Sequence, residues 1–549
     1  MLDFDALLEK IGPFGRYQII FYVVIGITSA PAGMQTLLSV YLFATPRHWC
    51  HVPELANLSL EEQRLLTVPP GELTGYPSDD ACYIYDVNYA EVYQKYVNNY
   101  SHVIGNASSV RECTHWSYDM ELYGLTAVSE WDLVCSKSFM TTIASSSFMF
   151  GFLIGVAVFG YMSDRIGRKL AWFIGLLVGV TFSTTASFMP EYWSFIIFRM
   201  ISGIALSGCY TVGFVLAMEM IGKEKRVAPG VAYQLWFTLG YVCSPAFAYP
   251  IKNYKWLNFT VSIIPAIFIP FYWIIPESAR WLLSTGRIAN AKYEINRMAR
   301  MNKVEKNGTL IAFESLLVQE AEKGIQPERK YNMIDLIRTP NMRSRAFNVL
   351  FNWLVNSMVF YGISLGVADL AGDPYINMVI SGASECVGIV TAIVTLNKLG
   401  RRWPLCVMMV FGGLACLAVN FLPYDWTVFG TVLAMLGKFG MAGSFAIIYV
   451  FTAELFPTVV RTIAVGSGSM GARFGGLIAP FITELGIIAW SPLPMIIFGS
   501  SALIGGGLSL LLPETLHQKL PETLEEGEEF GKQNKGNIFR LPKKSPITI

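Results

Sequence analysis

The stretch Gly160-Tyr-Met-Ser-Asp-Arg-Ile-Gly-Arg-Lys169 follows the apolar run Phe139–Met162. A run of this length is long enough to cross a lipid bilayer as a helix. The acid and the three bases of the stretch are costly to transfer into hydrocarbon, so they predict a boundary with water at the end of this helix. Gly160 and Gly167 are expected to let the turn pack closely against a neighbouring helix. An ordinary basic stop after a membrane helix has the same features, and the stretch alone does not exclude that simpler interpretation.

Landmarks of the first part of the chain return in the second part at an offset of about 235 residues. Three pairs share this offset: Gly160–Lys169 with Leu396–Arg402, Glu219 and Arg226 with Glu454 and Arg461, and Pro276–Ser278 with Pro513–Thr515. The chain is therefore interpreted as two related halves joined head to tail. A parallel repeat of membrane helices is typical of transporters that rock two bundles around a central site.

The composition supports a membrane protein, with 53% apolar and only 15% charged residues among 549. The net charge of +1 argues against a nucleic-acid partner. Apolar windows of membrane-spanning length predict twelve transmembrane helices in two six-helix halves, an all-α fold embedded in the lipid bilayer. These spans are Tyr17–Phe43, Phe139–Met162, Leu170–Phe188, Trp193–Met218, Pro229–Tyr249, Leu257–Ile275, Phe347–Val367, Tyr375–Leu396, Pro404–Leu422, Trp426–Phe451, Thr462–Ile482 and Pro494–Leu512.

Basic residues are concentrated in the short loops after spans two, four and eight, so these loops and both termini are expected to be cytoplasmic in a multi-pass plasma-membrane protein. The segment Met1–Gly15 has Lys10 as its only base, which argues against a cleaved signal peptide. The expected domains are a cytoplasmic N-terminus (1–16), a first half (17–275) with an extracellular loop (44–138), a cytoplasmic linker (276–346), a second half (347–512) and a cytoplasmic tail (513–549). The linker is expected to contain amphipathic helices, because Ile288, Ala291, Ile295 and Met298 recur at helical spacing.

The loop at 44–138 has the features of an extracellular segment. It contains the glycosylation sequons of Asn57, Asn99 and Asn106. It also contains Cys50, Cys82, Cys113 and Cys135, which predict two disulfides of undetermined connectivity. The chain ends in Ile547-Thr-Ile549, which is a weak signal for a PDZ-type partner.

Three ionisable residues fall near the middle of predicted spans: Glu385, Lys438 and Arg473. Each costs about 2.5–3.5 kcal/mol to insert at a helix centre, so each is expected to face a partner or a water-filled path. The alternative without a role in substrate binding is that Glu385 forms a structural ion pair with Lys438 or Arg473. The other residues expected to contact substrate are polar or aromatic: Tyr210, Gln234, Trp236, Tyr241, Asn352, Trp353, Asn356, Tyr361, Phe445 and Tyr449. Aromatic walls with a few charges suit amphipathic organic ions.

A second set of charges is expected to form a cytoplasmic gate. The hypothesis groups Asp164, Arg168, Arg199 and Glu219 in the first half, with Asp164 also facing the positive N-terminus of the eleventh helix near Val460. The remaining candidate gating residues are Arg165, Arg226, Arg401, Glu454 and Arg461.

The stretch Gly160–Lys169 and its second-half counterpart, Leu396–Arg402, resemble the loop signature of the major facilitator superfamily. The segment Pro276–Leu282 resembles a motif shared by sugar porters and organic ion transporters. The large first outer loop, Ser129–Cys135 and Thr452–Arg461 resemble solute carrier family 22. Within that family, the organic cation/carnitine (OCTN) group is the one that Leu42–Cys50, Gly437–Gly440 and Tyr449–Glu454 are similar to. In that family, organic cation transporters typically have an acid at the position of Arg473, whereas anion and zwitterion transporters typically have arginine. Cys209 departs from the polar asparagine expected in the carnitine carriers, and this difference weakens carnitine itself as the substrate.

The resemblance implies a polyspecific transporter of organic ions that works by alternating access. Arg473 favours zwitterionic or anionic solutes, carnitine-like and carboxylate-bearing, over simple cations. An organic cation transporter is the alternative, and a receptor or scaffold on a transporter fold is the alternative from another class. The sequence contains no enzyme, metal or cofactor motif, and it leaves sodium or exchange-anion coupling open.

Overall fold

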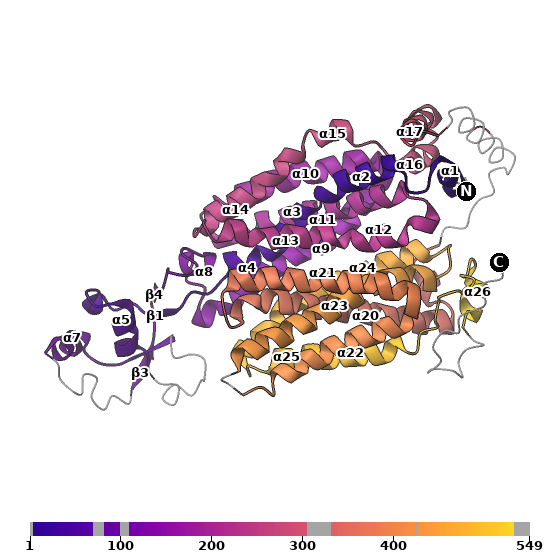
Figure 1. The fold of residues 1–549 in the computed structure, drawn as a ribbon. Coiled ribbons are helices and arrows are strands. Elements are labelled where there is room, and N and C mark those ends of the chain that lie inside the picture. The colour runs from indigo at the N-terminus through magenta and orange to yellow at the C-terminus, as the bar shows by residue number, and fades with distance from the viewer. Residues whose placement is uncertain are drawn as a thin grey trace.

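Long apolar helices build this protein because a lipid bilayer offers its backbone polar groups no water to bind. The computed structural model describes residues 4–69, 82–98, 109–304, 314, 331–423 and 426–531. Its helices form two bundles side by side, with a small module projecting from one end and the first and last described helices, α1 (Phe4–Ile11) and α26 (Leu524–Glu529), at the other (Figure 1). We call these ends of the molecule the loop end and the linker end.

The first bundle contains the first six predicted spans. Three of these spans are continuous helices: α9 (Ser138–Ile166), α10 (Arg168–Ala186) and α11 (Tyr192–Glu219). The other three are broken: α2 (Arg16–Ile27), α3 (Ala30–Leu37) and α4 (Ser39–Leu42) form the first, α12 (Val227–Ala232) and α13 (Gln234–Ala248) the fifth, and α14 (Tyr254–Ile263), η5 (Ile264–Phe268) and α15 (Phe271–Ile274) the sixth.

The second bundle is more regular. Its six helices are α20 (Pro340–Leu365), α21 (Pro374–Leu399), α22 (Arg402–Val419), α23 (Thr427–Leu455), α24 (Arg461–Ile488) and α25 (Leu493–Ser509). Each of the twelve predicted spans is thus confirmed as a helix or a broken helix. Among the described residues, ten helical stretches are long and apolar enough to cross a membrane, and the other two spans are the shorter α25 and the interrupted pair α12 and α13.

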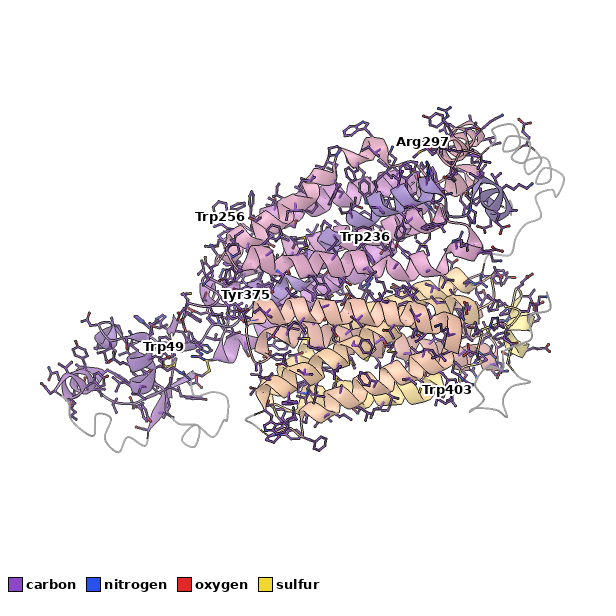
Figure 2. All side chains as sticks on the ribbon, in the orientation of Figure 1. Trp49, Trp236, Trp256, Arg297, Tyr375 and Trp403 are labelled. Atoms are coloured by element: carbon purple, nitrogen blue, oxygen red, sulfur yellow. A yellow bond between two sulfur atoms is a disulfide. The ribbon has the colours of Figure 1, made fainter. Side chains whose placement is uncertain are left out.

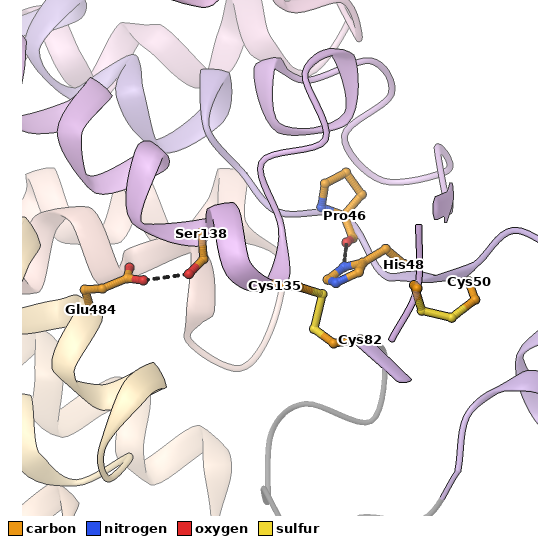
Figure 3. The surroundings of a disulfide bond; sticks show 8 residues. Pro46, His48, Cys50, Cys82, Cys135, Ser138 and Glu484 are labelled. Atoms are coloured by element: carbon orange, nitrogen blue, oxygen red, sulfur yellow. Dashed lines mark hydrogen bonds between the residues drawn. A yellow bond between two sulfur atoms is a disulfide. The ribbon is translucent and has the colours of Figure 1, made fainter. Parts of the chain in front are cut away.

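The module at the loop end is held together by its two disulfides, Cys50–Cys113 and Cys82–Cys135 (Figure 3). They join elements that are too short to form a core alone: β1 (His48–Cys50), η1 (Pro53–Leu55), α5 (Leu60–Thr67), β2 (Tyr83–Tyr85), α7 (Tyr89–Val97), β3 (Val110–Glu112), β4 (Trp116–Tyr118), α8 (Ala127–Glu130) and η3 (Cys135–Lys137). Strands β1 and β4 pair antiparallel, as do β2 and β3. The prediction of two disulfides is confirmed. Asn57 is exposed, while Asn99, Asn106 and the tail motif Ile547–Ile549 lie outside the described residues.

Each bundle has its own helices at the linker end. The first bundle packs against α1 (Phe4–Ile11), η4 (Lys223–Lys225), α16 (Ala279–Ser284) and α17 (Ile288–Met301), and the second against α19 (Met333–Ile337) and α26 (Leu524–Glu529). Helix α17 is amphipathic as predicted, with Ile295 and Met298 buried, although Ile288 is exposed. The Glu528 carboxylate accepts hydrogen bonds from the backbone N–H groups of Asn341 and Met342 and so caps the start of α20.

The hydrophobic core joins the two bundles at the loop end more than at the linker end. One buried cluster near the loop end contains residues of both bundles, among them Met34 and Tyr241 of the first and Met378 and Met435 of the second. Tyr375 lies at this end, next to the module (Figure 2). It follows the 3₁₀ turn η6 (Gly366–Asp369) and stacks on Tyr41 with ring centroids 5.4 Å apart. Toward the linker end one cluster lies within the first bundle, and another lies in the second bundle, where Val231 of α12 is the buried residue that the first bundle contributes. The structure is therefore of a state in which the loop end is closed.

Candidate functional site

A cavity between the two bundles contains most of the charged and aromatic residues singled out from the sequence. The open space within it, counted together with adjoining solvent, amounts to about 540 Å³. Its walls come from α9, α11 and α13 of the first bundle and from α20, α21, α23 and α24 of the second, and they are Phe152, Tyr210, Gln234, Phe237, Phe360, Tyr361, Glu385, Ile389, Ala442, Phe445, Tyr449 and Arg473. A central cavity lined by both repeats is where a transporter of this architecture binds its substrate.

Arg473 supplies a positive charge to this cavity. The side chain is only 7% exposed, and its guanidinium lies over the Phe152 ring of α9, 5.2 Å from the centroid. Small residues beside it bring α24 close to α20: a Cβ added at Gly475 would meet the Leu354 carbonyl oxygen at 2.2 Å. Within the described part of the chain, Arg473 forms no ion pair with an acid, and its buried Nε has no hydrogen-bond partner.

Glu385 and Lys438 form an ion pair at the wall of the cavity, with Nζ 3.5 Å from the carboxylate. The Glu385 carboxylate also accepts hydrogen bonds from the Thr238 hydroxyl at 2.5 Å and from the Tyr241 hydroxyl at 2.6 Å, both on α13 of the other bundle. Lys438 is fully buried, donates to the Ser364 hydroxyl and lies 3.7 Å from the centroid of the Phe360 ring. Of the two partners considered for Glu385, the structure selects Lys438.

Seven of the thirteen residues predicted to contact substrate line the cavity: Tyr210, Gln234, Tyr361, Glu385, Phe445, Tyr449 and Arg473. Lys438 and Tyr241 lie behind the wall and contact its residues. Both contact Glu385, and in addition Lys438 contacts Phe360 and Tyr241 contacts Phe237. The remaining four do not line it: Trp236, Asn352, Trp353 and Asn356.

These four side chains make contacts within their own bundles. Trp353 donates to the Thr452 hydroxyl at 3.0 Å, and Asn356 donates to the Asn352 carbonyl oxygen at 2.8 Å within α20. A Cβ added at Gly26 of α2 would meet the Trp236 ring nitrogen at 2.2 Å, so this ring fills the gap between α13 and α2. A polar or aromatic residue of a membrane helix can pack and form hydrogen bonds inside its own bundle. Its residue type therefore does not show whether its side chain faces a cavity.

The sequence reasoning missed five wall residues: Phe152, Phe237, Phe360, Ile389 and Ala442. Their side chains are apolar, like those that pack the bundles, so composition gives no signal for them. Thr142 and Ser146 of α9 contact α24, but Phe152 lies roughly 100° around the helix from them, so periodicity gives no signal for it either.

The first-half gate residues form a network at the linker end. Arg168 pairs with Asp164 at 2.8 Å and with Glu219 at 3.2 Å. The Glu277 carboxylate accepts hydrogen bonds from the backbone N–H groups of Arg168 and Lys169 and so caps the start of α10. Burial raises the pKa of the Glu277 carboxyl, and these backbone donors oppose that rise.

The second half repeats this network with corresponding residues. Arg401 pairs with Glu454 at 2.8 Å, and the Glu514 carboxylate caps α22 by accepting from the backbone N–H groups of Arg401 and Arg402. Arg461 lies at the first residue of α24, and in the described part of the chain no ion pair links it to Glu454.

One gate residue, Arg199, lies at the opposite end of the molecule, and two others lie at the linker end but outside this network. Arg199 is near the loop end of α11, only 2% exposed, and donates to the Ser39 hydroxyl at 2.7 Å; its placement in a linker-end cluster was wrong, because it lies two turns from the loop-end start of its helix. Arg226 pairs with Asp5 of α1 at 3.0 Å. Arg165 is exposed, over the Tyr161 ring.

Asp164 also departs from its expected contact with the start of α24. Its side chain is 71% exposed, and within the described residues its ion pair is with Arg168, one turn further along the chain. In this state, therefore, the charge of Asp164 remains on the first bundle.

Known proteins resemble this chain over most of its length. The family model described as "Sugar (and other) transporter" matches residues 81–526. An organic cation transporter protein of Drosophila melanogaster is 40% identical over 97% of this chain and 96% of its own length. Solute carrier family 22 member 4 of Mus musculus is 32% identical over 100% of this chain and 98% of its own length. The beta-alanine transporter of Drosophila melanogaster is 31% identical over 96% of this chain and 89% of its own length.

The fold also resembles that of a solved structure. The inward-open xylose transporter XylE from E. coli superposes with a TM-score of 0.62 at 15% identity, over 93% of this chain and 99% of XylE. With the two repeated bundles, the cavity between them and these relatives, the protein is a membrane transporter and not an enzyme, and its chain belongs to solute carrier family 22 of the major facilitator superfamily.

Proposed function

We propose that this protein moves small organic ions that bear a carboxylate, zwitterions above all, by alternating access through the cavity between its bundles. The observation that carries the proposal is the surroundings of Arg473. It lines the cavity, it is buried, and in the described residues no acid neutralises it. A guanidinium of this kind binds a carboxylate through two charge-assisted hydrogen bonds.

The other two buried charges leave the sign of the cavity unchanged. Glu385 and Lys438 neutralise each other, so the three charges sum to one positive charge, which is that of Arg473. A simple cation is repelled by this field, because the low dielectric of the interior screens it weakly. A carboxylate is attracted by it.

A zwitterion interacts with both the positive and the cation-attracting groups of the cavity. Its carboxylate binds Arg473, and its ammonium faces Glu385 and the surrounding tyrosine and phenylalanine rings, which attract cations. This arrangement also fits the names of two relatives, an organic cation transporter and a beta-alanine transporter, since a zwitterion has both a cationic group and a carboxylate.

An organic cation transporter is the second candidate, favoured by the access of Glu385 to the cavity. The two candidates are separated by competition in cells that express the wild-type protein. Uptake of a radiolabelled carboxylate zwitterion should be inhibited by carboxylate anions and zwitterions and only weakly by a quaternary ammonium ion without a carboxylate. Efficient uptake of that quaternary ammonium ion, with no competition by carboxylates, would reverse the assignment.

We further propose that the protein lies in the plasma membrane with its linker end and both termini in the cytoplasm. The support is the concentration of Lys and Arg in the short loops of the linker end and the exposed sequon of Asn57 at the loop end. Glycosidase treatment should increase gel mobility, and Asn57→Gln should remove part of that shift. Unchanged mobility of the wild-type protein after treatment would contradict this orientation.

A further inference from the structure

The two bundles meet along a seam between α9 and α24, which runs from the loop end to the cavity. At its outer end the rings of Phe139 and Phe481 contact each other, with centroids 5.8 Å apart. Two turns further in, the Ser146 hydroxyl donates to the Leu477 carbonyl oxygen. At the inner end, Phe152 of α9 lies under Arg473 of α24. The seam therefore covers the path from the loop end to the residue that we assign to the carboxylate.

The strongest polar contact of this seam involves Glu484. One carboxylate oxygen accepts from the Ser138 hydroxyl at 2.9 Å (Figure 3). The other accepts from the Thr142 hydroxyl, also at 2.9 Å. Ser138 and Thr142 are one turn apart, so a single face of α9 uses both oxygens. Glu484 is only 6% exposed, and within the described residues no Lys or Arg forms an ion pair with it.

A buried carboxylate held only by neutral hydroxyl groups is poorly suited to permanent structure. Burial removes its water, and two hydroxyl groups replace that water without neutralising the charge. When α9 and α24 separate, water solvates the carboxylate and both hydroxyl groups, so opening leaves none of them without a partner. The contact thus has defined hydrogen-bond partners in the closed state, and breaking it costs little free energy.

The start of α9 is also fixed from the outside. Cys135 lies three residues before Ser138 and is bonded to Cys82 of the loop-end module (Figure 3). This disulfide holds the first turn of α9, and therefore both hydroxyl donors, in register with the module.

We propose that Glu484 is a reversible latch, which closes the loop end over the cavity and must release Ser138 and Thr142 for that end to open. The inference rests on the proposed transport by alternating access, but it does not depend on which ion is carried.

A labelling experiment without substrate tests the latch. Ser146→Cys places a thiol behind the latch, and its reaction with a membrane-impermeant thiol reagent is measured on intact cells, corrected for the parent protein and for the amount at the surface. Glu484→Ala should raise the initial labelling rate at least threefold. Ser138→Ala combined with Thr142→Val should raise it to the same extent, and all three changes together should add nothing further.

Glu191→Ala is the matched control, because Glu191 is an exposed acid at the same end of the molecule and should leave the rate unchanged. If Glu484→Ala does not reach the surface, Glu484→Gln serves instead and should also raise the rate, since it removes one of the two acceptor oxygens. Unchanged labelling in the Glu484 variants, or effects that multiply when the partners are also replaced, would overturn the latch. A wrong substrate assignment would leave these results unaffected.

Discussion

Lys438 and Arg473 are both buried cations of the second bundle, but their surroundings differ, so we expect different roles for them. Lys438 is neutralised by Glu385, whereas Arg473 has an aromatic ring and open cavity around it. Removing one member of a buried ion pair costs about 3–5 kcal/mol, because the remaining charge loses its compensation. The pair is therefore expected to matter chiefly for stability.

Lys438→Met should lower the melting temperature of the purified protein clearly, since it leaves the Glu385 carboxylate buried with only two hydroxyl donors. The double variant Lys438→Met with Glu385→Gln should recover much of that loss, because no buried charge then remains. Thermal unfolding followed by tryptophan fluorescence measures both. A double variant less stable than Lys438→Met would contradict the structural role of the pair.

At the residue scale, the sequence predicts which charged residues lie inside the membrane more readily than it predicts which way a side chain points. A charge in the middle of an apolar span is rare, and Glu385, Lys438 and Arg473 could be found on that basis alone. Whether a residue faces the cavity depends on which helices meet, and Trp353 and Asn352 share α20 with Tyr361 yet lie behind the wall. Arg199 shows the same limit, because its charge is evident from the sequence but it lies only two turns from the loop-end start of α11.

At the element scale, the turn between α9 and α10 depends on one of its two glycines. Gly167 has φ +107°, and a Cβ added there would meet the Glu277 carboxylate at 2.4 Å. Gly160 has nothing within 4 Å of an added Cβ, so its expected close packing against a neighbour was wrong. Gly400 repeats the geometry of Gly167, with φ +89° and the Glu514 carboxylate at 2.4 Å.

Gly167→Ala should therefore impair the protein, by straining the turn and displacing the carboxylate that caps α10. We expect a loss of about 1–3 kcal/mol of stability and reduced surface expression. Gly160→Ala is the matched control from the same stretch and should behave like wild type. Equal surface expression and equal melting temperatures for the two variants would contradict this account of the turn.

The spans themselves were predictable because a bilayer requires a minimum length of apolar helix. The breaks in the first and sixth spans fall at prolines, Pro31 of α3 and Pro265 of η5, so the sequence contains a signal for them. The break between α12 and α13 has no proline at its junction, Tyr233. The disulfide pairing was equally out of reach, because four cysteines allow three connectivities and only the folded module brings Cys50 to Cys113.

At the scale of the whole molecule, the bundles are joined at the loop end and hold separate charge networks at the linker end. The repeat in the sequence predicted this symmetry, and corresponding residues do occupy corresponding places, as Arg168 with Glu219 and Arg401 with Glu454 show. A single sequence contains no signal for which state the pair of bundles adopts. Asp164 illustrates this limit, because its expected partner lies on the other bundle.

Asp164→Asn should slow transport several-fold while leaving surface expression intact. In the present state the side chain is exposed and its ion pair with Arg168 is worth at most about 1 kcal/mol, so folding is little affected. The contact we expect it to make with the start of α24 belongs to the state in which the linker end is closed. Glu224→Gln, at an exposed acid of η4 at the same end of the molecule, is the control. Normal maximal velocity in Asp164→Asn would remove this role.

The central claim is that Arg473 selects the carboxylate, and uptake by Arg473→Lys tests it most directly. The variant keeps the positive charge but loses the planar fork, so uptake of a carboxylate zwitterion at equal surface expression should fall about tenfold, the effect of one lost charge-assisted hydrogen bond. Arg473→Asp should abolish that uptake and admit a quaternary ammonium ion. Undiminished carboxylate uptake in both variants would contradict the account.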